Sequence, residues 1–126
     1  MLCKPVGWFE IYVQDMKRAK TFYEAVFSMQ LEKLESPDSN IEMWSFPGPM
    51  DDSNGTSGAV VKVNGRPSEG NSVIIYFMCK DCAIEAGRVS SNGGKLTKEK
   101  FSLGKFGFAA LITDTEGNVI GLHSMQ

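Results

Sequence analysis

One order of predicted secondary structure occurs twice along the 126-residue chain, and this repetition restricts the fold more than any other feature. In each half, a segment rich in β-branched and aromatic residues precedes an amphipathic segment, and three further strand-like segments follow. Asp15 and Asp81, which we expect to cap the two helices, lie 66 residues apart, and Leu31 and Leu96 lie 65 apart. A period near 65 is too long for a solenoid repeat. The sequence therefore predicts two copies of one β-α-β-β-β module.

The first module is predicted over about residues 5-63. The segment "VGWFEIYV" suits a strand, and a helix is expected after Asp15 because a carboxylate can accept from the free amides of a first helical turn. Three strands should follow, at about residues 31-34, 41-46 and 59-63. The apolar residues of the helix have the spacing of a single apolar stripe: Met16, Ala19, Phe22, Tyr23, Val26 and Phe27.

The second module is predicted over about residues 72-126. It begins with the strand "SVIIYFMC", and Asp81 is expected to cap the helix "CAIEAGRVSS", which "NGG" should end. Three more strands are expected in "KLTKE", "FGFAALIT" and "NVIGLHSM", with a bend at Gly104 and Gly107 and a hairpin turn at "DTEGN". Two such modules can bury their inner faces against each other. We therefore expect an α+β fold, a single domain over residues 1-126, with a concave cavity between curved sheets as the ligand site.

Composition and charge exclude several classes of partner. The net charge is −2 and the basic residues are dispersed, so nucleic acid is not an expected partner. No apolar stretch approaches the roughly 18 residues that a membrane span requires, and we expect no signal peptide in the first residues. Three cysteines, an odd number, argue against a disulfide framework and favour a reducing compartment. The cytoplasm is the expected location.

Three segments carry a resemblance to a known family: "VGWFEIYVQDMKRAKTFYEAVF", "FMCKDCAIEAGRVSSNGGKL" and "GFAALITDTEGNVIGL". With them the chain resembles the vicinal oxygen chelate superfamily, which contains glyoxalase I, bleomycin-resistance proteins and extradiol dioxygenases. It is most similar to the stand-alone proteins known as predicted lactoylglutathione lyase-related enzymes. The resemblance covers nearly the whole chain and is weakest over residues 36-58. It implies the fold above and a homodimer, but the superfamily hosts many activities, so it does not imply one function.

The resemblance also locates the metal site that this superfamily uses. Metal-using members place four His, Glu or Gln ligands on the inner faces of the first and last strands of the two modules. The matching positions here are Trp8, one residue within 56-61, Ile74 or a residue next to it, and Gly121. None of them supplies a carboxylate, imidazole or amide side chain, the nitrogen and oxygen donors that a divalent metal needs in such a site. We therefore expect no metal ion and no cofactor, and the metal-dependent lactoylglutathione lyase reaction is disfavoured.

The remaining candidates for a ligand site share the predicted inner faces by strand alternation. The acid and the base among them are Glu10 and His123, which is the one histidine of the chain. Either could act as a general base or bind a polar ligand. The structural alternatives are that His123 is a core residue near a fraying C-terminus and that Glu10 pairs with a lysine at the sheet edge. The full candidate set is Trp8, Glu10, Tyr12, Tyr76, Gly121 and His123.

The motif "CKDC" at residues 79-82 suggests redox chemistry or zinc, but a structural zinc site needs four ligands. Cys79 should face the helix as a small core residue, whereas Cys82 should lie at a helix N-terminus, where a thiol pKa is lowered. Overall, the sequence predicts a metal-independent protein that is similar to glyoxalases and bleomycin-resistance proteins and binds a small molecule. The alternative is a metal-free isomerase or lyase with Glu10 or His123 as general base.

Overall fold

The computed structural model describes residues 5–36, 38–48, 55–65 and 72–126. The elements follow the predicted order, β1-α1-β2-β3-β4 and then β5-α2-β6-β7-β8, so the repeated α+β module is confirmed. The chain divides into two compact units. The N-terminal unit is Trp8–Val73, and the C-terminal unit combines Met1–Gly7 with Ile74–Gln126. That the two form one domain stays a prediction.

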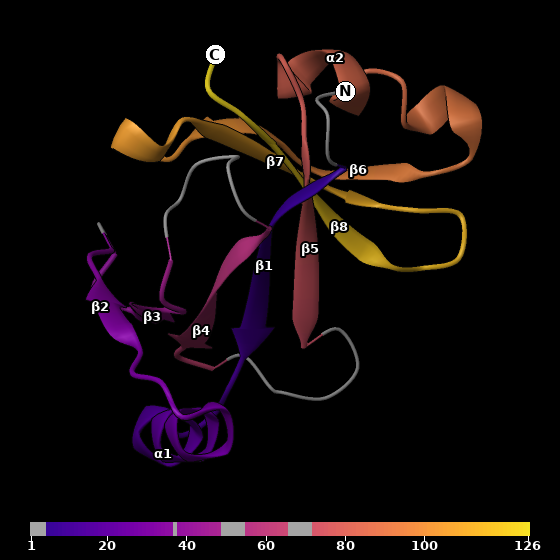
Figure 1. Ribbon diagram of the computed structural model, residues 1–126. Helices are drawn as coiled ribbons and strands as arrows, with labels where there is room; N and C mark the ends of the chain where they lie inside the picture. The colour runs from indigo at the N-terminus through magenta and orange to yellow at the C-terminus, as the bar shows by residue number, and fades with distance from the viewer. Residues whose placement is uncertain (1–4, 37, 49–54, 66–71) are drawn as a thin grey trace. The chain divides into compact units, whose positions relative to one another are not determined.

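In the N-terminal unit, four strands form a sheet in the order β2-β3-β4-β1 (Figure 1). Strand β1 pairs in parallel with β4, whereas β3 pairs antiparallel with both β2 and β4. The parallel pair is possible because a helix and two strands intervene between β1 and β4, which gives the chain length to cross over. The bounds are β1 Val6–Tyr12, β2 Glu32–Leu34, β3 Ile41–Ser45 and β4 Ser57–Val63.

Helix α1 (Met16–Phe27) packs on one face of this sheet. It begins as predicted at Asp15, whose carboxylate accepts from the backbone N–H of Arg18 at 3.0 Å. The core beneath it centres on Val60, which is fully buried, together with Met16 and Leu31. The helix ends at Ser28, whose φ of 51° lies in the left-handed region where the chain leaves a helix.

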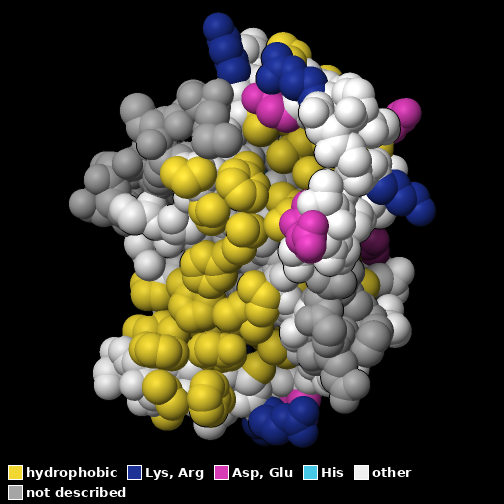
Figure 2. Space-filling view, turned by 90° about the vertical axis from the view of Figure 1, so that its right-hand side faces the viewer, with side chains coloured by type: hydrophobic (Ala, Val, Ile, Leu, Met, Phe, Trp, Pro, Cys, Tyr) yellow, Lys and Arg dark blue, Asp and Glu magenta, His cyan; other side chains and the backbone are white. Residues whose placement is uncertain are grey.

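The predicted single apolar stripe of α1 is wrong in part. Ala19 and Tyr23 pack on the core, but Phe22, Val26 and Phe27 are 57%, 57% and 62% exposed. Each residue advances about 100° around a helix, so Phe22 points well away from the line of its neighbour Tyr23. Figure 2 shows the result: hydrophobic side chains are visible at the lower end of the view, at the level of α1. The spacing was helical, yet the sheet covers only part of the stripe.

The C-terminal unit repeats the arrangement with the strand order β5-β8-β7-β6. Strand β5 pairs in parallel with β8, and β7 pairs antiparallel with β8 and β6. Helix α2 (Cys82–Ala86) contacts β6, β7 and β8, and its core includes Cys79, Ala110 and Leu122. The strand bounds are β5 Val73–Met78, β6 Lys95–Ser102, β7 Phe108–Thr113 and β8 Val119–Ser124.

Helix α2 is shorter than predicted, because only five residues of "CAIEAGRVSS" are α-helical and a separate 3₁₀ turn follows at Ser90–Asn92. Gly87 directly follows the helix, and glycine has little tendency to extend one. The start is as predicted: Asp81 accepts from the N–H of Ala83 at 3.0 Å. The buried hydroxyl of Ser124 accepts from the N–H of Cys82 at the same distance. Two side chains therefore satisfy the first amides of α2.

Both predicted turns of the second module are present. Gly104 and Gly107 have φ values of 65° and 93°; Gly104 begins a 3₁₀ turn, Gly104–Phe106, between β6 and β7, and Gly107 directly follows it. In the hairpin between β7 and β8, Asp114 accepts from the N–H groups of Glu116 and Asn118. Within the part of the chain that the structure describes, neither helix has the length or the apolar composition to span a bilayer.

Candidate functional site

The three predicted site residues of β1 lie on the face of the N-terminal sheet away from α1. Phe9 packs against Phe46 on the helix-covered face, so Trp8, Glu10 and Tyr12 alternate to the other side. In the neighbouring parallel strand, Ser57, Ala59 and Val61 are their respective partners. Because the residues at 57 and 59 are small, the larger side chains of β1 form most of this face.

Glu10 is the centre of this group. It is only 8% exposed, and its two carboxylate oxygens accept from different neighbours. The indole N–H of Trp8 donates to Oε2 at 3.1 Å, and the Tyr12 hydroxyl donates to Oε1 at 2.6 Å. The second distance is in the range of a charge-assisted O–H···O bond. Burial of a carboxylate is costly without such donors, so the structure holds this anion in place rather than leaving it to solvent.

The other three predicted residues lie together in the C-terminal unit. Tyr76 is paired with Gly121, and Met78 with His123, on the face of the sheet opposite the α2 core. The Tyr76 ring fills the space above Gly121, because a Cβ at Gly121 would clash with it. The structure thus places Trp8, Glu10 and Tyr12 in one unit and Tyr76, Gly121 and His123 in the other. Their joint role as ligand contacts stays a prediction.

His123 does not lie in a frayed terminus. It is half-buried in β8, between Met78 on β5 and Ala109 on β7, and its carbonyl accepts from the N–H of Cys79 at 2.7 Å. Its Nε2 is 2.6 Å from the carbonyl oxygen of Phe106. A carbonyl can only accept, so Nε2 carries the proton and the neutral ring keeps its lone pair on Nδ1. Nδ1 is therefore the atom that could accept a proton from a substrate.

The residues at the four expected metal-ligand positions do not fit a divalent metal. Trp8 offers only an N–H donor, Ser57 beside it offers a hydroxyl, and Ile74 is buried and apolar. At Gly121 the ring of Tyr76 occupies the space that a ligand side chain would need. Within the described residues, no three His, Cys, Asp or Glu side chains gather as a metal site requires.

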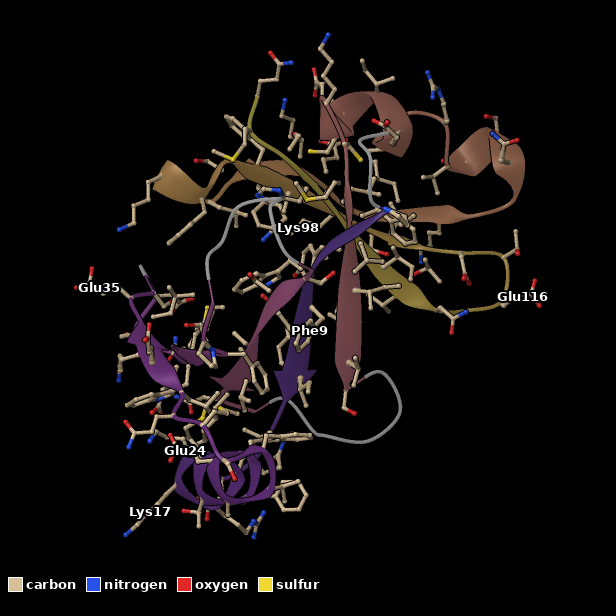
Figure 3. All side chains as sticks on the ribbon, viewed as in Figure 1. Phe9, Lys17, Glu24, Glu35, Lys98 and Glu116 are labelled. Atoms are coloured by element: carbon tan, nitrogen blue, oxygen red, sulfur yellow. The ribbon has the colours of Figure 1, made fainter. Side chains whose placement is uncertain are left out.

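Strand β6 contributes a residue, Lys98, that was not among the candidates from the sequence. Leu96 pairs with Ile112 towards the α2 core, and simple alternation would point Lys98 the same way. A register shift between Leu96 and Lys98 instead pairs Lys98 with Leu111, on the face that carries Tyr76 and His123. Figure 3 shows Lys98 on the side of this sheet away from α2. A β-bulge of this kind redirects a side chain, and no periodic pattern reveals it in advance.

Both cysteines of "CKDC" are core residues of the C-terminal unit. Cys79 and Cys82 are 3% and 0% exposed, and both are free thiols in the α2 core. Burial raises the pKa of the Cys79 thiol to about 11, with a further contribution from the nearby Glu85 carboxylate. Cys79 is therefore protonated and unreactive at neutral pH. This opposes a redox function for Cys79.

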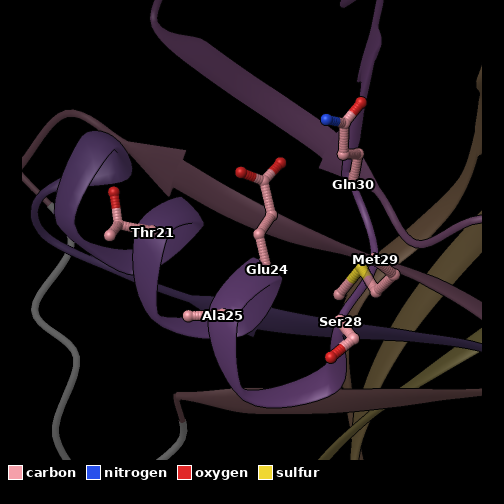
Figure 4. A pocket seen from close by; sticks show the side chains of 6 residues that line it. All are labelled: Thr21, Glu24, Ala25, Ser28, Met29 and Gln30. Atoms are coloured by element: carbon pink, nitrogen blue, oxygen red, sulfur yellow. The ribbon is translucent and has the colours of Figure 1, made fainter.

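One surface hollow of about 530 Å³ lies at the C-terminal end of α1, and its lining is shown in Figure 4. The acid in this lining, Glu24, is already used: it accepts from the Leu31 N–H at 2.9 Å and pairs with Lys20 at 3.0 Å. These hydrogen bonds, the backbone one first, hold the pKa of Glu24 below its ordinary value. The lining residues are Thr21, Glu24, Ala25, Ser28, Met29 and Gln30, and they offer no base for catalysis.

Known proteins share sequence features and the fold with this chain. A family model described as the Glyoxalase/Bleomycin resistance protein/Dioxygenase superfamily matches residues 6–122. Methylmalonyl-CoA epimerase from Mycobacterium tuberculosis is similar in fold, with a TM-score of 0.70 and 17% identity over 100% of this chain and 93% of that one. The hypothetical protein BH1468 from Bacillus halodurans gives a TM-score of 0.73 and 13% identity over 96% and 94% of the two chains. No curated protein matches the chain by sequence.

Proposed function

The chain belongs to the glyoxalase/bleomycin resistance protein/dioxygenase superfamily, and from this premise we propose that it binds a small organic molecule without the help of a metal ion. The ligand is a small, partly aromatic or polar compound. The observation that carries the proposal is the group Trp8, Glu10 and Tyr12. The indole of Trp8 occupies a position where metal-using relatives have a metal ligand. Its N–H donates to the buried carboxylate of Glu10.

The arrangement of this group suits recognition of an organic molecule. Trp8 and Tyr12 are half-buried and offer ring faces, while Glu10 fixes both by accepting from their polar ends. Rigid aromatic side chains lose little conformational entropy when a ligand packs on them. A solved relative, a methylmalonyl-CoA epimerase, has been observed in complex with methylmalonyl-CoA, which supports a small-molecule role for this fold. We also propose the cytoplasm and a homodimer as the protein's setting.

The second candidate function is a metal-free isomerase or lyase. Two observations favour it: several similar solved structures are epimerases, and the hydrogen bond of His123 to Phe106 leaves Nδ1 as a proton acceptor. A base of this kind would remove a proton next to a carbonyl group. Incubation with methylmalonyl-CoA in D₂O, followed by NMR, tests this candidate. Deuterium at C2 that depends on His123 or Glu10 supports it, and a rate equal to the buffer rate rejects it.

Intrinsic fluorescence gives a direct test of binding, because the chain has two tryptophans. Trp44→Phe leaves Trp8 as the reporter on the proposed site, and Trp8→Phe leaves Trp44 as the matched control. Trp44 lies on the α1 side of the sheet, where its indole donates to Glu42 and Lys20 lies over its ring. A library of small aromatic and polar compounds is then titrated into both variants in the presence of EDTA.

We expect at least one compound class to change the Trp8 signal saturably, with micromolar to millimolar affinity, and to leave the Trp44 signal unchanged. Binding that appears only after a divalent metal is added would contradict the metal-independent part of the proposal. A library in which no compound changes Trp8 or protects the protein against thermal unfolding would contradict the binding function itself.

A further inference from the structure

We propose that the C-terminal unit binds an organic anion, a carboxylate or a phosphate ester with an apolar body, and that Lys98 binds its charged group. The inference goes beyond the proposed function, whose site is the Trp8, Glu10 and Tyr12 group of the N-terminal unit. The site is the face of the C-terminal sheet opposite α2, in which Lys98 is one end of a row across four strands. That row is Tyr76, Gly121, Leu111 and Lys98.

Two aromatic rings stand at the ends of this face, and the half-buried Leu111 lies between them. The Tyr76 ring covers Gly121, and in the adjacent row Ala109 is small and almost fully buried. The Tyr76 ring leans over Gly121 from one end, and Phe101, paired with Ala109, stands at the other. An apolar ligand body can therefore lie over Leu111 between two aromatic rings, which offer favourable contact area.

Two register shifts in β6 position Lys98, the positively charged residue of the proposed site. Register shifts on both sides of Lys98 let Lys98 and Phe101 share a face although they are three residues apart. The Lys98 ammonium lies 4.0 Å from the centre of the Phe101 ring, a cation–π contact that holds the long side chain over the sheet. Lys95, opposite Thr113, points to the same side, so this part of β6 presents two positive charges.

Lys100 has a different orientation from Lys98 and a different role. It lies on the same strand but faces α2, where it pairs with Asp81 at 2.9 Å and lies over the Phe108 ring. Its charge therefore supports the cap of the helix. Lys98 is exposed and its described contact is the Phe101 ring, which leaves its N–H donors able to bind an anion. Carboxylate and phosphate oxygens are both acceptors for such a group, so the two ligand types are separate arms of the test.

The experiment is an NMR titration of the full chain with matched pairs of probes. Phenylacetate is compared with phenylacetamide, which has the same shape without the charge, and phenyl phosphate with phenol. Backbone amides of Lys98, Leu111 and Gly121 report on the proposed face, and those of α2 serve as an internal control. The titration is repeated with Lys98→Gln and with Lys100→Gln, two variants with the same change in net charge on opposite faces of β6.

We expect one anionic probe to bind about fivefold more tightly than its neutral partner at low salt, as a partly exposed ion pair allows. Lys98→Gln should remove this preference and Lys100→Gln should retain it, with folding of both checked by circular dichroism. Equal binding of the neutral partners, or an unchanged preference in Lys98→Gln, overturns the inference. If neutral compounds still change Trp8 fluorescence, the proposed function survives that result. If no compound binds in either assay, the result contradicts both the inference and the proposed function.

Discussion

The hydrogen bond from Tyr12 to Glu10 makes a quantitative prediction about the N-terminal group. At 2.6 Å it is a charge-assisted bond to a carboxylate that is 8% exposed. Such bonds contribute about 1.5–3 kcal/mol, and the half-buried Tyr12 puts this one towards the lower end. Tyr12→Phe removes only the hydroxyl. We expect it to lower the free energy of unfolding by about 1.5–2 kcal/mol.

Urea denaturation followed by circular dichroism measures this loss. With an m-value of about 2 kcal/mol per molar urea, the midpoint should fall by nearly 1 M while m stays constant. In a Glu10→Met background, where the acceptor is gone, the same Tyr12→Phe change should cost less than about 0.5 kcal/mol. If Glu10→Met does not fold, Glu10→Gln replaces it and the cost should drop to about 1 kcal/mol. An equal cost in both backgrounds would refute the pairing.

Three further predictions concern the C-terminal unit. At pH 9, a long-range ¹H–¹⁵N correlation spectrum should show His123 with its proton on Nε2, whereas a proton on Nδ1 would contradict the bond to Phe106. Because unfolded Cys79 loses its proton near pH 9 and the folded thiol holds it to about pH 11, stability should fall over that interval, and Cys79→Ala should lack this slope in urea titrations. Ser124→Ala should cost about 1–3 kcal/mol in thermal unfolding, since it leaves the buried Cys82 N–H without its acceptor; a loss below 0.5 kcal/mol would mean that water replaces the hydroxyl.

Most of the fold could be predicted from local sequence signals. Asp15 and Asp81 cap the two helices as expected, and the glycine turns lie where positive φ values are needed. These features depend on a few neighbouring residues, so sequence alone specifies them. The errors arose where tertiary structure decides. The exposure of Phe22 depends on how far the sheet extends under α1, and the early end of α2 at Ala86 depends on competition with the following turns.

The candidate site, like the fold, could be predicted from the sequence only in part. Strand alternation correctly assigned Trp8, Glu10 and Tyr12 to one face, because β1 is regular. Alternation alone would not have placed Lys98 on its observed face, because a bulge in β6 changes the alternation and has no sequence signature of its own. The bond from His123 to Phe106 joins residues 17 apart across a turn, so its fixed tautomer also required the structure.

The central claim is that this chain binds its ligand without a metal ion. The most direct test is native mass spectrometry and metal analysis of protein purified without a histidine tag, before and after titration with nickel, zinc, cobalt, iron and manganese. Ligand affinity, read from Trp8 fluorescence, is measured in parallel with and without EDTA. We predict no stoichiometric metal and the same affinity in both conditions. One tightly bound metal per chain, with ligand binding lost on chelation, would contradict the account and restore a metal-dependent site.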